Sequence, residues 1–186
     1  HWGMNSYRPD AIANYFIRHC DPVATGLTPM KIQKLVYFAH GWHLALKFAP
    51  LITDQVEAWK YGPVIDRLYH ALKDHDDSPV TDPIVKVRII SEQGKPVQME
   101  PFEASIEDDP DLHPFVPALL QRVLKVYGKY SAIQLSKMTH EEGSPWHQVM
   151  KRFTKFLPQG VPIPDEMIRD YFLTKIPNEQ PDTIHP

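Results

Sequence analysis

The nine residues Met138–Trp146, MTHEEGSPW, place a histidine, two glutamates and a serine close together in the chain. His140 beside Glu141 and Glu142 has the composition of a general acid–base pair, and Ser144 carries the hydroxyl of an acyl-transfer nucleophile. Acyl transfer also requires a base within hydrogen-bond reach of the serine, and donors for the oxyanion. Neighbours in sequence seldom point at one substrate, and a serine before a proline is also typical of a helix N-cap. A small hydrolase that uses His140 with a neighbouring carboxylate is therefore kept as an alternative to a structural role.

The other patterns that could do chemistry are incomplete. The chain has no Gly-x-Ser-x-Gly elbow and no phosphate-binding glycine loop, and it contains only 8 glycines. His40 and His43 have the i, i+3 spacing of a metal chelate, but no Cys, Asp or Glu nearby completes the ligand set. His70 and the acidic run 74–77 offer more ligands, yet they join a helix end to a loop, where charges are usually solvated. We therefore predict no catalytic residues, no metal site and no cofactor.

The bulk composition excludes several classes of protein. With 42% hydrophobic and 11% aromatic residues, the chain can bury a core. A net charge of -3 gives no general electrostatic footprint for nucleic acid or for an anionic membrane. The single cysteine, Cys20, cannot form an internal disulfide, and no apolar run reaches the roughly 18 residues that span a bilayer. We expect a cytoplasmic protein with no membrane partner.

The stretch 131–153 superficially resembles a helix-turn-helix, which keeps a DNA-binding regulator open as a second alternative. Its second helix would carry Lys151, Arg152 and Lys155. The two glutamates of the intervening turn would face DNA phosphates unfavourably. We therefore regard nucleic acid as a disfavoured partner.

Hydrophobic periodicity predicts the elements that must position these residues. Apolar residues recur at helical spacing in segments that begin with prolines or capping residues, among them Thr28 before Pro29 and a capping-box pattern at Ser131 and Gln134. The predicted helices cover residues 9–20, 29–46, 64–73, 114–127, 131–138, 145–156 and 164–176. A change of period within 55–61 predicts a short strand. The runs 84–90 and 96–102 predict a hairpin around a turn that contains Gly94.

These elements predict one mainly α domain over residues 9–176. We expect an essentially all-α bundle of six to seven helices with the small β element (the short strand and the hairpin at 84–102) in its middle. The helix that begins at Pro29 is apolar on most sides, which places it at the centre of the core. An N-terminal arm, 1–8, is expected to precede the domain, with residues 1–3 as a cloning remnant. The polar segment 177–186 is expected to be a loose tail.

Three stretches taken together resemble one known family. They are LTPMKIQKLVYFAHGWHLAL at 27–46, VEAWKYGPVIDRLYHAL at 56–72 and YSAIQLSKMTHEEGSPWHQV at 130–149. In this order they resemble the Panacea antitoxin domain, which is also met in phage-associated GepA-like and SocA-like proteins. The motif residues that carry the resemblance are Thr28, Lys31, Gln33, Lys34, Trp42, Thr139, His140, Pro145 and Trp146.

The resemblance implies a non-enzymatic antitoxin that neutralises a cognate toxin by direct contact. Some relatives are described as adaptors that deliver the toxin to an ATP-dependent protease, so such a protease is a second implied partner. Neither activity follows from the composition or the spacing, and the oligomeric state stays open.

Aromatic residues around the predicted strand are the candidates for partner binding, because exposed rings often anchor protein interfaces. An open edge on this short strand could also accept a strand from the partner. The candidate residues are Tyr37, Trp59, Tyr61, Gly62, Pro63 and Val64. For His140 we expect a structural hydrogen bond that ties the junction to the 59–61 segment.

Overall fold

The helix α3 (Pro29–Lys47) lies at the centre of the molecule, as its largely apolar sequence predicts. The computed structural model describes residues 5–156 and 158–177. Thr28 caps the helix by accepting a hydrogen bond from the amide of its third residue, and Pro29 takes the first helical position. Both features agree with the prediction from sequence.

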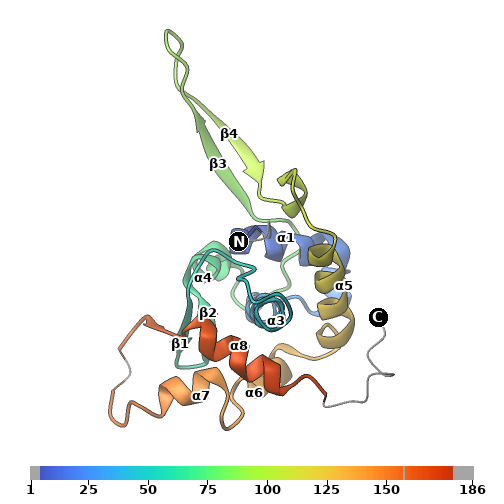
Figure 1. Ribbon diagram of the computed structural model, residues 1–186. Helices are drawn as coiled ribbons and strands as arrows, with labels where there is room; N and C mark the ends of the chain where they lie inside the picture. The colour runs from blue at the N-terminus through green and yellow to red at the C-terminus, as the bar shows by residue number, and fades with distance from the viewer. Residues whose placement is uncertain (1–4, 157, 178–186) are drawn as a thin grey trace.

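Three helices surround α3, which Figure 1 shows end-on: α1 (Pro9–His19), α5 (Phe115–Tyr127) and α8 (Asp165–Thr174). The closest approach is that of α8, because α3 carries Gly41 at the crossing. A Cβ at Gly41 would overlap the ring of Phe172, which is buried against the helix.

The remaining helical segments are short. They are α2 (Pro22–Thr25), α4 (Asp66–Leu72), α6 (Ala132–Thr139) and α7 (Pro145–Met150), with 3-10 turns at η1 (Lys73–His75) and η2 (Ile106–Asp108). The capping box predicted at Ser131 and Gln134 is present on α6, and Ser144 caps α7. The described residues contain eight α-helices rather than six to seven, because Asp21 caps a further short helix instead of only ending the first.

A three-stranded antiparallel sheet lies against α3 in the order β2-β1-β5. Strand β1 (Val56–Trp59) has the predicted alternation of buried and half-buried residues, and it pairs with β2 (Gly62–Ile65) and β5 (Val161–Pro162). The predicted helix from residue 64 begins too early, because Gly62 at φ +120° turns the chain back onto β1. The predicted helix 145–156 is too long, since α7 ends well before residue 156.

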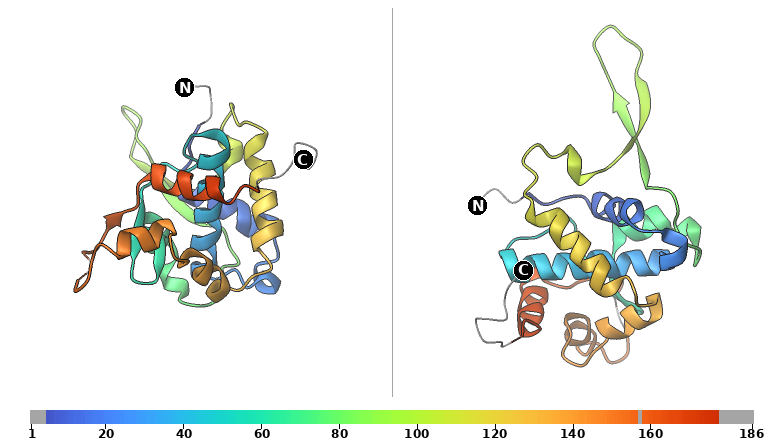
Figure 2. Two further views of the ribbon diagram at one scale, coloured as in Figure 1. Left: turned by 60° about the horizontal axis from the view of Figure 1, so that its bottom comes forward. Right: turned by 90° about the vertical axis from the view of Figure 1, so that its right-hand side faces the viewer.

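The predicted hairpin is formed by β3 (Val85–Ile90) and β4 (Gln98–Glu103). It stands away from the helical body in Figures 1 and 2. With two small antiparallel sheets, the fold is mainly α, and the expectation of an all-α bundle overstated its helical character.

Three residues of α1, spaced four apart, hold the base of this hairpin. Asp10 Oδ2 forms an ion pair with Lys86 Nζ at 2.9 Å, and Arg18 forms an ion pair with Glu103. Between them, the buried side chain of Asn14 bonds to the backbone where both strands leave the body. Its Nδ2 donates to the carbonyl oxygens of Ile84 (3.1 Å) and Ala104 (2.9 Å), and its Oδ1 accepts from the Ile84 amide at 2.7 Å.

Some predictions fall at the ends of the chain. The expected remnant at 1–3 and most of the expected tail at 177–186 lie outside the described residues. In the ranges 5–156 and 158–177, no helix combines the length and the hydropathy needed to cross a membrane.

Replacing Asn14 by alanine should detach the hairpin base from α1, because the side chain is 1% exposed and makes three backbone hydrogen bonds. Each unpaired buried group costs about 1–3 kcal/mol and some rearrangement is expected, so the free energy of unfolding in urea should fall by roughly 2–4 kcal/mol. Asn5→Ala, at an exposed asparagine, is the matched control and should lower it by less than about 1 kcal/mol. A loss equal to that of the control would contradict the anchoring role.

Candidate functional site

The three sequence motifs meet where the turn between β1 and β2 crosses α3. Lys34 of α3 is 2% exposed, and its amine donates to the carbonyl oxygens of Pro63 (3.1 Å) and Tyr61 (3.5 Å). Burial lowers the pKa of the Lys34 amine to about 8, because the charged form is held away from water. The amine therefore fixes the turn to the helix.

Gly62 lies at the centre of this crossing. A Cβ there would lie 2.7 Å from Lys34 Nζ, and 3.3 Å from both His140 Nε2 and Thr139 Oγ1. Polar atoms from α3 and from the end of α6 thus converge on one glycine. The Lys34, Gly62 and Thr139-His140 parts of the motif are brought together by the fold.

The outer edge of β2 is occupied by another motif residue, Gln33. Its Nε2 donates to the carbonyl of Ile65 and its Oε1 accepts from the amide of Ile65, both at 3.0 Å. Pro63 has no amide to offer on the same edge, and its carbonyl is taken by Lys34. The idea that the predicted strand offers an open edge to a partner is therefore wrong: β1 is paired with β2 and β5, and α3 side chains bind the outward groups of Pro63 and Ile65 on β2.

The junction between α6 and α7, where the sequence analysis began, is a hydrogen-bonded structural unit. Ser144 Oγ donates to the Thr139 carbonyl at 2.9 Å and accepts from the His147 amide at 3.2 Å. Trp146 Nε1 donates to the carbonyl of Trp59 at 2.6 Å and so ties the junction to β1. The Ser144 hydroxyl is thus committed to the backbone and is not poised as a nucleophile.

The hydrogen bond that we expected from His140 to the 59–61 segment is at most weak: the Tyr61 backbone is close enough to raise the pKa of the ring against the larger lowering effects, but no bond of good geometry forms. The His140 ring lies 4.1 Å from that of Trp146, and its buried Nε2 has no partner within the described ranges. Burial and the nearby Lys34 lower the pKa of His140. The link from the junction to the 59–61 segment is made instead by Trp146, and by Ser136 Oγ, which donates to the Tyr61 carbonyl at 3.4 Å.

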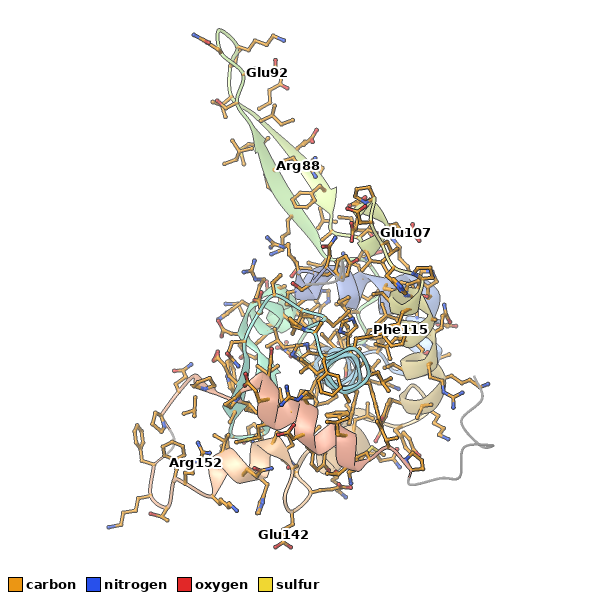
Figure 3. The ribbon with its side chains drawn as sticks, viewed as in Figure 1. Arg88, Glu92, Glu107, Phe115, Glu142 and Arg152 are labelled. Atoms are coloured by element: carbon orange, nitrogen blue, oxygen red, sulfur yellow. The ribbon has the colours of Figure 1, made fainter. Side chains whose placement is uncertain are left out.

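The neighbouring glutamates do not form an acid–base pair with His140. Glu141 Oε2 accepts hydrogen bonds from the Tyr171 hydroxyl (2.5 Å) and from Lys175 Nζ (3.0 Å). Its carboxylate therefore links the junction to the C-terminal end of α8. Glu142 points outward at the tip of the junction in Figure 3. The geometry therefore gives no support to a hydrolase built on this stretch.

The two histidines of α3 are buried core residues, and among the described residues the Nε2 of His43 has no hydrogen-bond partner. His40 Nε2 bonds to Asp165 Oδ1 at 3.0 Å, and His40 Nδ1 accepts from the Leu51 amide at 3.3 Å. His43 Nδ1 bonds to the Ala49 carbonyl at 2.5 Å, and burial lowers the pKa of its ring. In the part of the chain that is described, no group of three or more His, Cys, Asp and Glu side chains is arranged to hold a metal ion.

The candidate helix-turn-helix lacks a recognition helix. The second helix, α7, is only 6 residues long and ends before Lys151 and Arg152. Lys155 lies further along the following loop. The basic residues that were expected on a DNA-reading helix are therefore not on a helix.

Two further motif residues also have structural roles. Lys31 Nζ donates to the carbonyls of Thr25 (2.5 Å) and Gly128 (2.6 Å), which ties α2 and the end of α5 to α3. Trp42 Nε1 donates to the Tyr127 hydroxyl at 2.8 Å. The motif thus describes the framework that surrounds α3.

A pocket of about 530 Å³ opens beside the β1–β2 turn. Its walls come from the first turns of α3, from the two strands and from α4 with η1. The lining residues are Pro29, Met30, Gln33, Lys34, Trp59, Lys60, Tyr61, Val64, Tyr69, Leu72, Lys73 and Asp76. The rings of Trp59 and Tyr69 lie 4.9 Å apart, and Tyr61 is 66% exposed. This is an apolar, aromatic surface with charged residues at its rim.

The structure separates the predicted partner-binding residues into two groups. Trp59, Tyr61 and Val64 line the pocket. Tyr37 is 3% exposed and packs against Phe172, so it belongs to the core and cannot meet a partner. Gly62 and Pro63 are also buried and act by shaping the turn. Tyr37 was misjudged because α8 covers the side of α3 that carries this ring.

The sequence analysis did not assign Met30, Tyr69 and Leu72 to a site. Tyr69 and Leu72 both fall in the predicted helix 64–73; Leu72 is 1% exposed, whereas Tyr69 is 43% exposed. The available signal for a binding surface was Tyr69, an aromatic residue at the margin of the apolar stripe of this helix. Only the approach of α4 to the β1–β2 turn shows that these residues share a surface.

Gly62→Ala should destabilise the protein, because the new methyl group would meet the buried Lys34 amine and adopt an unfavourable φ. We expect the free energy of unfolding in urea to fall by roughly 2–4 kcal/mol. Gly94→Ala is the matched control: it has φ +79° at the hairpin tip with nothing within 4 Å, so only about 1 kcal/mol of backbone strain is expected. Equal losses for the two variants would contradict close packing at Gly62.

Lys34→Met should show how the buried amine links stability to pH. Since the folded pKa is about 8 and the ordinary value is 10.5, the unfolded chain binds more protons between these values. The stabilising contribution of Lys34 is therefore complete above pH 10.5 and is lost as pH falls through about 8. The difference in unfolding free energy between the native chain and Lys34→Met should increase by about 2.5 kcal/mol from pH 7 to pH 10.

Equilibrium urea unfolding at a series of pH values measures this difference. Lys60→Met removes an exposed lysine from the same turn and is the matched control. A difference between native and Lys34→Met that does not change with pH would contradict a desolvated amine.

Comparison with known proteins places this framework in a family. Residues 32–147 match the model described as antitoxin SocA-like, Panacea domain. Antitoxin SocA of Caulobacter vibrioides (strain NA1000 / CB15N) is 31% identical over 162 residues, which cover 87% of this chain and 80% of that relative. No solved structure matches the chain significantly. The matched span contains Lys34, Gly62 and His140, which meet at the β1–β2 turn, and the chain belongs to the SocA-like Panacea antitoxin domain family.

Proposed function

We propose that this chain is an antitoxin that neutralises a cognate toxin by direct contact at the pocket beside the β1–β2 turn. Family membership supports the antitoxin role. The observation that carries the choice of contact site is the ring of Tyr61, which is 66% exposed beside a pocket of about 530 Å³. Aromatic side chains in such positions supply much of the affinity of protein interfaces.

The pocket suits an apolar or aromatic side chain of the toxin as its anchor. Met30, Val64 and Leu72 supply aliphatic walls. The rings of Trp59 and Tyr69, which are tilted relative to each other, supply an aromatic wall. An anchor that enters such a pocket loses contact with water over most of its surface, which favours binding.

The rim of the pocket adds electrostatic preference. Lys60 and Lys73 are exposed there against one acidic residue, Asp76. An acidic residue beside the anchor of the toxin would therefore be favoured, mainly through a faster association rate.

The framework beneath the pocket favours tight binding because it holds the turn in one conformation. Lys34 binds the turn from below, and Trp146 binds the carbonyl of Trp59. A surface that is already ordered loses little conformational entropy when a partner binds.

The family resemblance also implies a second mode of action, delivery of the toxin to an ATP-dependent protease. The same toxin-binding surface would serve both modes. They differ in the fate of the toxin, which is retained in direct inhibition and degraded in adaptor action.

Tyr61→Ala should weaken toxin binding by roughly tenfold to a hundredfold, because it removes an exposed ring at the mouth of the pocket. The toxin to test is the product of the gene encoded beside this one. Growth rescue on co-expression and the dissociation constant of the purified pair are the measurements.

Phe48→Ala is the matched control, since Phe48 is also 66% exposed but lies at the opposite end of α3. Toxin abundance during rescue separates the two modes: an unchanged level indicates inhibition, and a fall that requires the protease indicates adaptor action. Absence of both rescue and co-purification with the native chain would overturn the proposal. Equal binding by Tyr61→Ala and the native chain would overturn the assigned contact site.

A further inference from the structure

Within residues 5–156 and 158–177, the projecting hairpin has one complete strand edge without a pairing strand, on β3. Val87 lies opposite Pro101 in the register of the two strands. Because proline has no amide to donate, this pair is a non-hydrogen-bonded pair of the ladder. The amide and carbonyl groups of Val85, Val87 and Ile89 therefore point away from β4. The corresponding edge of β4 is interrupted, since Pro101 offers no donor there.

The side chains of the same three β3 residues form an apolar strip. Val85, Val87 and Ile89 are 59%, 58% and 68% exposed, and Met99, opposite Ile89, is 70% exposed. They share one face of the hairpin because residues two apart on a strand point the same way. Figures 1 and 2 show no other element beside this hairpin along most of its length. A strand edge and an apolar strip thus lie together, open to solvent.

The hairpin is held in a defined direction although its outer part buries little. Asp10, Asn14 and Arg18 of α1 fix its base, and two of these three, Asp10 and Asn14, are almost fully buried. A two-stranded hairpin alone is marginally stable in water. The anchoring by α1 therefore presents the β3 edge at a fixed orientation to the body.

The charges on β3 distinguish between a second copy of this chain and another polypeptide. Lys86 and Arg88 alternate with the apolar residues, and β3 carries no acidic residue. Antiparallel pairing with a second copy that keeps the apolar faces together puts Lys86 or Arg88 opposite Lys86 or Arg88 of that copy. Like charges directly opposite are destabilising. Each has one carboxylate nearby, Asp10 for Lys86 and Glu100 for Arg88, and the Arg88 guanidinium also lies over the Phe102 ring of β4.

We propose that the edge of β3 binds an extended segment of the toxin as an added strand, with apolar residues at alternate positions and acidic residues between them. The identification of the partner as the toxin rests on the proposed function. The backbone groups of Val85, Val87 and Ile89 bind the added strand, their side chains cover its apolar residues, and Lys86 and Arg88 attract its carboxylates.

Fluorescence anisotropy of the full chain with two labelled heptapeptides tests this proposal. One peptide alternates valine with glutamate and the other alternates valine with lysine. We expect saturable binding of the glutamate peptide, and at least about tenfold weaker binding of the lysine peptide. Val87→Pro deletes an outward amide without removing a hydrogen bond to β4, and should lower the affinity for the glutamate peptide by about tenfold or more. Val87→Ala keeps that amide and should weaken it by only about threefold.

A second variant keeps the test independent of any distortion by proline. Arg88→Glu should abolish or reverse the preference for the glutamate peptide, since one of the two positive charges on β3 changes sign. Ile133→Ala, at a residue of α6 that is 66% exposed, is the control and should bind as the native chain does.

Three results would overturn strand addition by an acidic partner: no saturable binding, equal binding of both peptides, or full binding by Val87→Pro. A concentration-dependent dimer in sedimentation velocity that is lost in Val87→Pro would assign the edge to a second copy instead, and would equally overturn it. Because neither assay contains the toxin, a negative result leaves neutralisation at the pocket untouched. Failure of growth rescue, in turn, leaves the peptide result standing.

Discussion

The burial of the Lys34 amine is the interaction on which the described architecture depends. A lysine removed from water must find acceptors or lose its charge, and the acceptors here are two backbone carbonyls of the β1–β2 turn. The turn must therefore cross α3 at this position, and only a residue without a Cβ fits between the amine and the end of α6. Trp146 then binds the carbonyl of Trp59 from the far side of the turn. One amine and one indole thus locate three segments that are distant in sequence.

The same device recurs through the molecule: buried polar side chains bind backbone groups where an element ends. Lys31 binds carbonyls near the ends of α2 and α5, Gln33 occupies the edge of β2, and Asn14 binds both strands at the hairpin base. Each case satisfies groups that would otherwise lose water without a partner. This pattern gives the β3 edge its significance. The edge of β2 is covered by an α3 side chain, whereas the longer edge of β3, with apolar side chains, has no such cover in the described structure.

Local signals predicted the elements well, and tertiary contacts explain the errors. The Thr28-Pro29 start, the Ser131 capping box and the alternation of β1 depend on residues within one turn or strand, so the sequence contains them in full. The two-residue strand β5 exists only because β1 lies beside it, and no local pattern marks it. Tyr37 could not be placed by periodicity, since α3 is apolar on most sides and only the packing of α8 shows that the side with this ring is covered. The three stretches that carry the resemblance contain Lys34, Gly62 and His140, but the fold was needed to show that these residues meet at one point.

The two surfaces proposed for the partner differ in what they recognise, and this difference follows from their construction. The pocket is formed by side chains on a fixed turn, so it selects a particular anchor by shape and polarity. The β3 edge offers backbone groups, which bind an extended chain of many sequences, and only the alternation of apolar and basic residues adds selectivity. Both surfaces belong to one framework, since α3 holds the turn and α1, packed on α3, holds the hairpin. A partner that engages both gains from the fixed distance between them, because the second contact then forms at high effective concentration. Rigid internal anchoring of the turn and of the hairpin would serve the proposed binding of another polypeptide, because neither surface has to be ordered when the partner arrives.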